Sequence, residues 1–425
     1  MRLLYTLLLY LITPLLLARL AWRGRRQPGY RQRWGQRLGF GLPKVPPGGL
    51  WLHAVSVGEV QTILPLLARL RERLPDCPIL VTTTTPTGAE VLRRGAPKGV
   101  VHAWLPFDLP GAVARFLRRT RPACAVIVET ELWPNTFAAC ARRQIPLLIV
   151  NARLSERSLR GYRRLRPLAA TTLTCVTRLL ARDASDADRF IALGTPPQRV
   201  SVGGNLKFDI APPPDLAERR AALRRRLGHD RPIWIAASTH PGEEALALAA
   251  HAAIRRRLPG ALLILAPRHP ERCANVEGQI RASGMGVTTR SSGAQCSPVC
   301  EVFLLDTLGE LGDFYAAADV AFVGGSLVAT GGHNILEPAL TGTAIVHGPH
   351  MFNFAAVRDA FRAAGATREV ANDEALAATV SRLLGDRAER EALADAARQV
   401  LAANRGALDR VEAAIVHQLR LPPRP

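Results

Sequence analysis

The sequence has 425 residues, of which 48% are hydrophobic and 21% are charged, and its formal net charge is +21. This composition excludes a disordered chain, and the length favours two domains over a single core. Nearly all of the positive charge is arginine, because only Lys44, Lys98 and Lys207 are lysines. Such a basic surface attracts polyanions, which means nucleic acid, anionic lipid or a phosphorylated substrate.

The N-terminal segment is apolar and carries no charge from Leu3 to Ala18. As a helix, Leu3–Trp22 is about 30 Å long, which is the thickness of the hydrocarbon core of a bilayer. Arg19 can extend to the interface, and the arginines within Arg23–Arg37 predict that the rest of the chain stays cytoplasmic. We therefore expect residues 1–22 to be a membrane anchor. The alternatives are a helix buried in the protein and a removed signal peptide, which the lack of an Ala-x-Ala cleavage pattern disfavours.

The next part of the chain alternates short apolar stretches with helical patterns, from Leu50 to about Lys207. This alternation indicates βα units and a parallel sheet covered by helices on both faces. The same rhythm starts again near Ile233. We predict strands over Leu50–Ser56, Pro78–Thr85, Val101–Leu105, Ala123–Glu129, Pro146–Asn151, Thr171–Thr177, Val200–Gly203, Ile233–Ala237, Leu262–Ala266, Val302–Asp306, Val320–Val323 and Ala344–His347.

The break between the two βα regions lies at residues 211–231, where three prolines precede a charged helical run. Such a stretch is typical of a linker with a short helix. We therefore predict an α/β protein with two doubly wound, Rossmann-like domains, residues 23–210 and 232–425, with a helical tail at the end of the second. Both domains are expected to present the carboxyl ends of their strands to a cleft, where ligands bind in such sheets.

Metal and cofactor sites are not expected. The seven cysteines are odd in number and scattered, which indicates free thiols in a reducing compartment, and Cys296 and Cys300 lack the second Cys/His pair of a zinc site. Asp186 and Asp188 match the acidic pair by which many enzymes bind a metal ion, but the surrounding RDASDADRF favours a helix start with Ser185 and Asp188 as a capping box. Neither a P-loop nor a G-x-G-x-x-G motif is present.

In the N-terminal half, carboxylates follow predicted strands. Glu59 ends HAVSVGE in the first turn of a helix; the alternative role is stabilisation by the helix dipole, worth about 0.3–1 kcal/mol. Glu129 and Glu131 lie in VETELWPN and share one face if the strand continues that far. Such a pair repels, which raises one pKa unless a cation intervenes. Lys207, in GGNLKFD, is a rare lysine just before the linker.

In the C-terminal half, the motifs indicate anion binding. Arg268 directly follows a predicted strand in APRHPER, and the pairs Gly324–Gly325 and Gly331–Gly332 precede a helix expected to start near Asn334. Glycines let backbone N–H groups approach a phosphate, and a helix N-terminus supplies positive potential. Glu337, one turn into that helix, is placed to accept hydrogen bonds from ribose hydroxyls. Together these residues predict a nucleotide-phosphate pocket.

The sequence resembles the bacterial 3-deoxy-D-manno-octulosonic acid (Kdo) transferases over about residues 1–360. The resemblance implies a GT-B fold and an inverting, metal-independent transfer of Kdo from CMP-Kdo to the lipid A precursor, lipid IVA. That reaction belongs to lipopolysaccharide core biosynthesis on the cytoplasmic face of the inner membrane. The resemblance rests on motifs that occur in the family's order, namely HAVSVGE, TTTTPTG, ETELWPN, NARLSERS, GNLKFD, PRHPER, DTLGEL, FVGGSL, GGHNILEPA and GPHMFNF.

The resemblance also implies roles for individual residues. Glu59 would be the general base for the acceptor hydroxyl, a role that contributes about 10²–10⁴-fold to the rate. Glu129 and Lys207 would help to stabilise the transition state. Ile335 stands where many members have Pro, and Phe208 where many have Tyr, but both changes keep the polar groups in place. The CMP site would be lined by Pro267, Arg268, Leu308, Gly309, Glu310, Asn334, Ile335, Leu336 and Glu337.

Two other functions are alternatives to Kdo transfer. Another GT-B enzyme, such as a nucleotide-sugar 2-epimerase, needs neither a lipid acceptor nor a membrane segment, so residues 1–22 argue against it. A membrane-tethered nucleic-acid-binding protein would interleave basic clusters with exposed aromatics, and aromatic residues make up only 5% of the chain. The expected partners are therefore CMP-Kdo, the lipid A precursor and the anionic lipids of the inner membrane, with no nucleic acid and no cofactor.

Overall fold

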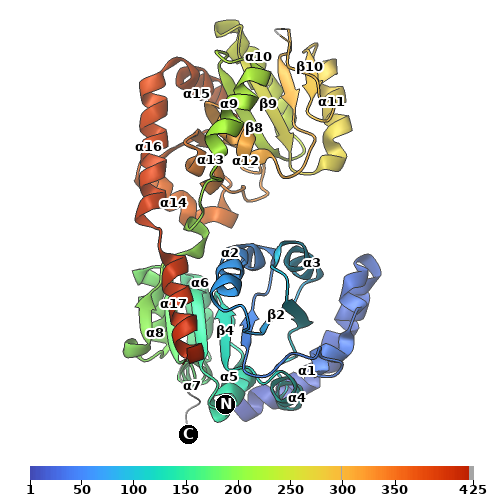
Figure 1. The fold of residues 1–425 in the computed structure, drawn as a ribbon, viewed down its shortest axis with the longest axis vertical. Helices are drawn as coiled ribbons and strands as arrows, with labels where there is room; N and C mark the ends of the chain where they lie inside the picture. Colours follow the sequence, from blue (N-terminus) through green and yellow to red (C-terminus); the bar gives the residue numbers. More distant parts are fainter. Residues whose placement is uncertain (298, 421–425) are drawn as a thin grey trace. The chain divides into compact units, whose positions relative to one another are not determined.

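The computed structural model describes residues 1–297 and 299–420, which divide into two compact units (Figure 1). Unit 1 combines Met1–Asp209 with the chain from Arg405 onward, and unit 2 is Ile210–Asn404. Each unit is built on a seven-stranded parallel sheet. The prediction of two doubly wound α/β folds is confirmed.

The sheet of unit 1 has the strand order β3-β2-β1-β4-β5-β6-β7. The chain builds outward on one side of β1 and then on the other, so β1 and β4 flank the switch point where ligands bind in such sheets. The strands are β1 (Leu50–His53), β2 (Ile79–Thr83), β3 (Val100–Trp104), β4 (Cys124–Val128), β5 (Leu147–Ala152), β6 (Arg178–Ala181) and β7 (Val200–Val202).

Helices cover both faces of this sheet because alternate strand residues point to opposite sides. Trp51 and Ile127 point into a core with Phe137 of α5, whereas Leu52 and Val126 point into a second core under α2. The helices that follow the strands are α2 (Val57–Arg73), α3 (Pro86–Gly95), α4 (Pro110–Thr120), α5 (Pro134–Arg142), α6 (Glu156–Arg163), α7 (Arg166–Leu173) and α8 (Ala184–Leu193), with short 3₁₀ helices η1 (Pro28–Arg31), η2 (Trp34–Leu38), η3 (Pro197–Arg199) and η4 (Leu206–Phe208).

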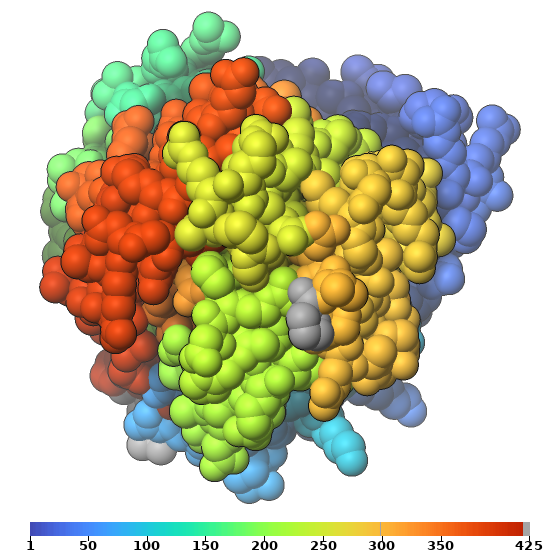
Figure 2. Space-filling model, turned by 90° about the horizontal axis from the view of Figure 1, so that it is seen from above, coloured from blue at the N-terminus to red at the C-terminus, as the bar shows by residue number. Residues whose placement is uncertain are grey.

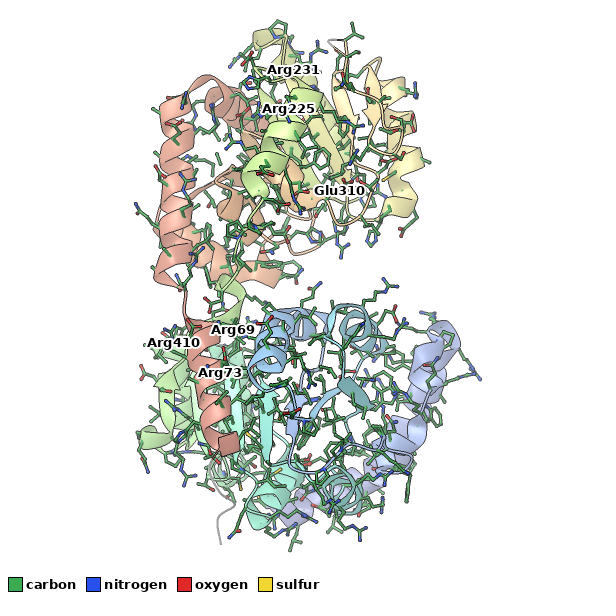
Figure 3. The ribbon with its side chains drawn as sticks, in the orientation of Figure 1. Arg69, Arg73, Arg225, Arg231, Glu310 and Arg410 are labelled. Atoms are coloured by element: carbon green, nitrogen blue, oxygen red, sulfur yellow. A yellow bond between two sulfur atoms is a disulfide. The ribbon has the colours of Figure 1, made fainter. Side chains whose placement is uncertain are left out.

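The last helix, α17 (Ala407–Arg420), packs on unit 1, although the sequence places residues 232–425 in a single C-terminal domain. Its Val411 and Ile415 are buried in the core under α2. Its Glu412 is only 3% exposed and forms ion pairs with Arg69, at 2.6 Å, and Arg73, at 2.8 Å, on α2 (Figure 3). The sequence predicts the helical pattern of this segment, but it does not predict that the helix packs on the sheet of unit 1.

Unit 2 has the strand order β10-β11-β9-β8-β12-β13-β14, with its switch point between β8 and β12. Its strands are β8 (Ile233–Thr239), β9 (Leu262–Pro267), β10 (Val287–Thr289), β11 (Val302–Leu304), β12 (Val320–Val323), β13 (Ala344–His347) and β14 (Thr367–Glu369). Its helices are α9 (Leu216–Leu227), α10 (Glu243–Arg257), α11 (Cys273–Ala282), α12 (Leu311–Ala317), α13 (Leu336–Thr341), α14 (Ala355–Ala363), α15 (Asp373–Gly385) and α16 (Arg387–Ala403), with η5 (Pro270–Arg272) and η6 (Phe352–Phe354).

The segment expected to be a linker, residues 211–231, contains α9, and this helix is part of unit 2. Leu227 at its end is fully buried in a core with Ile233 and Phe314. Figure 2 shows α9 and α10 in yellow-green on the surface of unit 2, beside the amber segment that includes α11. The prolines therefore mark the unit boundary, but the helix after them is not a free connector.

Two local predictions are wrong. Thr171–Thr177 does not form a strand, because α7 extends to Leu173, a turn follows, and β6 starts later, at Arg178. The threonines of this segment bond backward to the helix, as Thr171 and Thr172 donate to the carbonyls of Pro167 and Leu168 at 2.7 Å. Cys296 and Cys300, predicted to be free, form a disulfide, while the other five cysteines are free.

The N-terminal helix α1 (Arg2–Arg26) is longer than the predicted anchor and is part of unit 1. Among the described residues, it is the helix that is long and apolar enough to cross a membrane, by length and composition. It lies along the outside of unit 1 and starts beside α5 (Figure 1). One side faces the protein, and the other exposes leucines such as Leu7, Leu11 and Leu15.

Candidate active site

The first element of the site is Glu59, in the first turn of α2 just after β1. The Val55 N–H donates to its Oε2 at 2.8 Å, and the Ser56 hydroxyl donates to its Oε1 at 3.1 Å. The carboxylate thus helps to close the turn at the start of α2, as the helix-end alternative supposes. It is also fixed in one orientation at the carboxyl end of β1, beside the switch point.

The second element is a strained turn after β4, which carries Glu129. The sequence predicts a strand through Glu129, but β4 ends at Val128 and Glu129 has φ 61°. A positive φ is unfavourable for a residue with a side chain, and such residues occur in turns and at functional sites. The Glu129 N–H still donates to the Val150 carbonyl at 3.0 Å, so β5 holds the turn in place.

Lys207 enters the site through the end of β5. Asn151, at that end, also has a positive φ of 52°, and its Oδ1 accepts the Leu206 N–H at 3.1 Å. Asn205 accepts the Lys207 N–H at 3.1 Å. These two side chains fix η4, and with it the backbone that carries Lys207.

The electrostatics show that these groups lie together. Burial raises the pKa of Glu59 to about 7, and the charges of Glu129 and Glu131 raise it too. Burial likewise raises the pKa of Glu131 to about 7, with Glu129 adding to the shift. Burial lowers the pKa of Lys207, while Glu129 and Glu59 act in the opposite direction. The three predicted catalytic residues are therefore one cluster, with Glu131 as a fourth member.

In unit 2, a buried carboxylate that the sequence did not single out organises the glycine-rich loop. Glu243 of α10 is fully buried. Its two carboxylate oxygens accept backbone N–H groups of His240, Gly325, Ser326 and Leu327 at 2.9, 2.6, 3.0 and 2.9 Å. This carboxylate joins the loop after β8 to the loop after β12, across the switch point. The only signal in the sequence was an acidic pair in the first turn of the helix that follows β8.

Arg268 and three histidines surround the same loops. The Arg268 N–H donates to the Thr239 carbonyl at 3.0 Å, and its side chain is exposed. The His240 and His333 rings stack, with their Nε2 atoms 2.8 Å apart, and His269 lies edge-on to His240. Burial lowers the pKa of His333 to about 4, and the nearby His240 and Arg268 charges lower it further. Burial also lowers the pKa of His240. Both rings therefore favour the neutral form at pH 7, and Arg268 provides the guanidinium group beside them.

The remaining predicted residues occupy loops after the strands of unit 2. Glu310 does not stand free: Arg290 binds its carboxylate at 2.6 Å, and this ion pair lowers the pKa of Glu310. Pro267 ends β9, whereas Leu308 is 77% exposed and Gly309 has φ 88° with open space around its Cα. Both residues lie in the loop before α12 and can reach a ligand.

The motif around Asn334 is arranged by its own side chains. Asn334 Nδ2 donates to Glu337 at 3.0 Å, and its Oδ1 accepts the Leu336 N–H at 3.1 Å. The side chains of Ile335 and Leu336 are buried in the core, so only their backbone can face a ligand. The helix expected to start near His333–Asn334 is present, although α13 begins at Leu336 and has only six residues. Burial raises the pKa of Glu337.

The acidic pair considered for a metal ion has another role. Asp186 is buried and forms ion pairs with Arg182, at 3.0 Å, and Arg189, at 3.2 Å. The cap of α8 is Asp183, which accepts the Asp186 N–H at 2.7 Å, so the predicted capping box of Ser185 and Asp188 is wrong. The Asp186 carboxylate thus stabilises the turn before α8.

The comparisons with known proteins identify the relatives of this chain. A family model described as 3-deoxy-D-manno-octulosonic-acid transferase (kdotransferase) matches residues 32–210. A 3-deoxy-D-manno-octulosonic acid transferase of Haemophilus influenzae is 38% identical over 96% of this chain and 97% of its own length. The enzyme of the same name from Bordetella pertussis is 39% identical over 96% of both chains.

Solved structures with the same architecture are more distant in sequence. UDP-GlcNAc 2-epimerase from Neisseria meningitidis, bound to UDP-GlcNAc, is 13% identical, with a TM-score of 0.55 over 87% of this chain and 99% of that one. At this identity the likeness shows the fold alone, and the fold is of the GT-B type. The shared fold therefore does not favour the epimerase alternative.

Glu243→Ala tests the organisation of the loops in unit 2. The substitution leaves buried backbone N–H groups without an acceptor, and each such group costs about 1–3 kcal/mol. We expect unit 2 to lose at least about 3 kcal/mol of stability, measured by hydrogen–deuterium exchange of peptides from β8 and β12. Glu271→Ala, at a 76% exposed glutamate in the same unit, is the control and is expected to change little. Equal exchange in both variants would contradict the role of Glu243.

Proposed function

The chain belongs to the Kdo transferase family, and on that premise we propose that it transfers Kdo from CMP-Kdo to the lipid A precursor, lipid IVA. Kdo transfer in lipopolysaccharide biosynthesis follows from the family. The donor, the acceptor, an inverting course and independence from a metal ion are the proposal. The observation that carries it is the carboxylate cluster at the switch point of unit 1, in which Glu59 has a pKa of about 7.

Glu59 is suited to be the general base. An acceptor hydroxyl is a poor nucleophile at neutral pH, and a base with a pKa near the operating pH is the most effective proton acceptor. Glu59 takes the hydroxyl proton while the acceptor oxygen bonds to the anomeric carbon of Kdo. The bond from that carbon to the phosphate oxygen of CMP breaks in the same step, and CMP leaves. A single displacement of this kind inverts the anomeric centre.

The second requirement is that the protein stabilises the negative charge on the leaving CMP. Arg268 is the exposed guanidinium of unit 2 beside the glycine-rich loop, and a charge-assisted contact to phosphate is among the stronger hydrogen bonds of proteins. The neutral rings of His240 and His333 can donate N–H groups without adding a charge. Asn334 and Glu337 are the polar groups proposed to face the nucleotide. Because arginine supplies the positive charge, the proposed mechanism uses no metal ion.

The membrane location is also part of the proposal. The exposed apolar side of α1 is suited to the acyl region of a bilayer, and the arginines within Arg23–Arg37 are suited to anionic headgroups. An excess of arginine next to an apolar segment is typical of the cytoplasmic side. We therefore propose the cytoplasmic face of the inner membrane, where the acceptor would be a phosphorylated glycolipid.

Glu59→Gln tests the proposed reaction directly. Purified full-length protein is incubated with CMP-Kdo and a tetra-acylated lipid A precursor, and the products are weighed by mass spectrometry. Wild-type protein is expected to add Kdo. Glu59→Gln is expected to lose about 10²-fold or more of kcat, because the amide cannot accept the hydroxyl proton.

The matched control is Glu72→Gln, an exposed glutamate on the same helix, which is expected to keep normal activity. CMP binding, measured by calorimetry, is expected to be the same in all three proteins. Near-normal turnover of Glu59→Gln would show that Glu59 only stabilises the start of α2 and is not the base. No product from wild-type protein would refute the proposed substrates.

The pH dependence provides an independent test. Because burial raises the pKa of Glu59 to about 7, kcat/KM is expected to fall below about pH 7 as this carboxylate becomes protonated. Glu131→Gln removes a nearby negative charge and is expected to move this acid limb to lower pH. Ser56→Ala removes a hydrogen-bond donor to the carboxylate and is expected to move it to higher pH. If neither variant moves the acid limb of the kcat/KM profile, that limb reports the titration of a group other than Glu59.

A further inference from the structure

Unit 1 contains a cavity of about 370 Å³ between the inner side of α1 and the loops at the carboxyl ends of β1 to β4. We call it the α1 pocket. Ligand pockets of this size are typically apolar with a few placed polar groups. The apolar walls of the α1 pocket include Leu16 and Leu20 of α1, Leu105 and Phe107 after β3, and Trp133 after β4.

The wall formed by α1 is held against unit 1 at both ends of the helix. Near its start, Tyr5 Oη donates to Asp108 at 3.1 Å, and Asn135 Nδ2 donates to Thr6 Oγ1 at 3.0 Å. Near its end, the Arg31 guanidinium donates to the Ala21 carbonyl at 3.2 Å. A helix of 25 residues is about 37 Å long, so these contacts hold it along the protein instead of letting it project away.

The inner end of the α1 pocket reaches the carboxylate cluster. Glu131 lines the pocket, and its charge contributes to the raised pKa of Glu59. Val55 also lines it, and the Val55 N–H is the donor to Glu59 Oε2 at 2.8 Å. The hydroxyls of Thr84 and Thr85 donate to the Val55 carbonyl at 3.2 and 3.3 Å. A molecule in this pocket therefore lies beside the proposed base.

The outer side of the same helix is apolar and exposed. Leu7, Leu11 and Leu15 are 68, 78 and 69% exposed, which suits contact with acyl chains in the plane of a membrane. Arg19 and Arg23 line the pocket while being exposed themselves, so they mark its mouth. An apolar cavity with guanidinium groups at its mouth complements an acyl chain that ends in a phosphorylated headgroup.

We propose that the α1 pocket binds one acyl chain of the phosphorylated glycolipid acceptor, with the arginines at its mouth meeting a phosphate of the same molecule. The proposal rests on the proposed function and extends it. It makes α1 a wall of the acceptor site that lies along the membrane surface. The acyl chain enters beside α1, and the sugar hydroxyl of the same lipid comes to lie near Glu59.

Leu16→Trp and Leu15→Trp separate the two sides of α1. Leu16 lines the pocket, and Leu15, its neighbour, points outward. A tryptophan at residue 16 fills the cavity. Since the loss of about two buried methylene groups already weakens binding about tenfold, KM for the tetra-acylated acceptor is expected to rise about tenfold or more. Leu15→Trp is expected to keep the wild-type KM, and both variants to keep the KM for CMP-Kdo.

A second measurement uses wild-type protein and does not depend on turnover. A tetra-acylated acceptor with a photoactivatable group on one acyl chain is bound to the full-length protein in phospholipid vesicles, irradiated and mapped by mass spectrometry. Crosslinks to Leu16, Leu20, Phe107 or Trp133 are expected, including in Glu59→Gln. They are expected to survive a large excess of unlabelled phospholipid.

Several outcomes overturn the proposal. Crosslinks confined to Leu7, Leu11 and Leu15 would make α1 an anchor only, and an unchanged acceptor KM in a folded Leu16→Trp would do the same. Crosslinks abolished by phospholipid would assign the pocket to a structural lipid. Each result is distinct from failure of the proposed function, which is the absence of Kdo transfer by wild-type protein.

Discussion

The structure depends on one electrostatic constraint: several carboxylates are held in partly buried positions at the carboxyl end of a parallel sheet. Removing a carboxylate from water disfavours its charged form, and a neighbouring carboxylate disfavours it further. The backbone N–H of Val55 and the hydroxyl of Ser56 donate hydrogen bonds to the carboxylate and oppose this effect, so the pKa of Glu59 is raised to about 7. A group balanced in this way can both lose and accept a proton at neutral pH, which is the property that base catalysis requires.

The positions of these groups follow from the switch point in the sheet of unit 1, where the order of the strands reverses. Glu59 and Glu129 follow the two strands that flank the switch point, and the positive φ of Glu129 turns the chain at the end of β4. Unit 2 also has a buried carboxylate at its switch point, but this carboxylate stabilises backbone loops. There the carboxylate of Glu243 faces inward and accepts four backbone N–H groups, and the backbone N–H of Arg268 donates to the Thr239 carbonyl at the end of β8.

Much of this was predictable from local sequence patterns. The βα rhythm places Glu59, Glu129, Lys207 and Arg268 after strands, and the structure brings the first three together. Features that depend on contacts between distant segments were not predictable. The burial of Glu243, the packing of α17 on the sheet of unit 1 and the cavity beneath α1 each involve residues far apart in the chain. The strand predicted over Thr171–Thr177 was wrong for a related reason, because the packing of α7 overrode the β propensity of its threonines.

The central claim is that the protein fold, and not a ligand, sets the pKa of Glu59, and it can be measured without substrate. Infrared difference spectra of wild-type protein and Glu59→Gln, recorded across a pH series, isolate the carboxyl stretch of Glu59. The account predicts a protonated carboxyl that disappears with a midpoint near pH 7. A midpoint near the ordinary glutamate value of about 4.3 would contradict it, because Glu59 would then be an ordinary, solvated helix-end carboxylate.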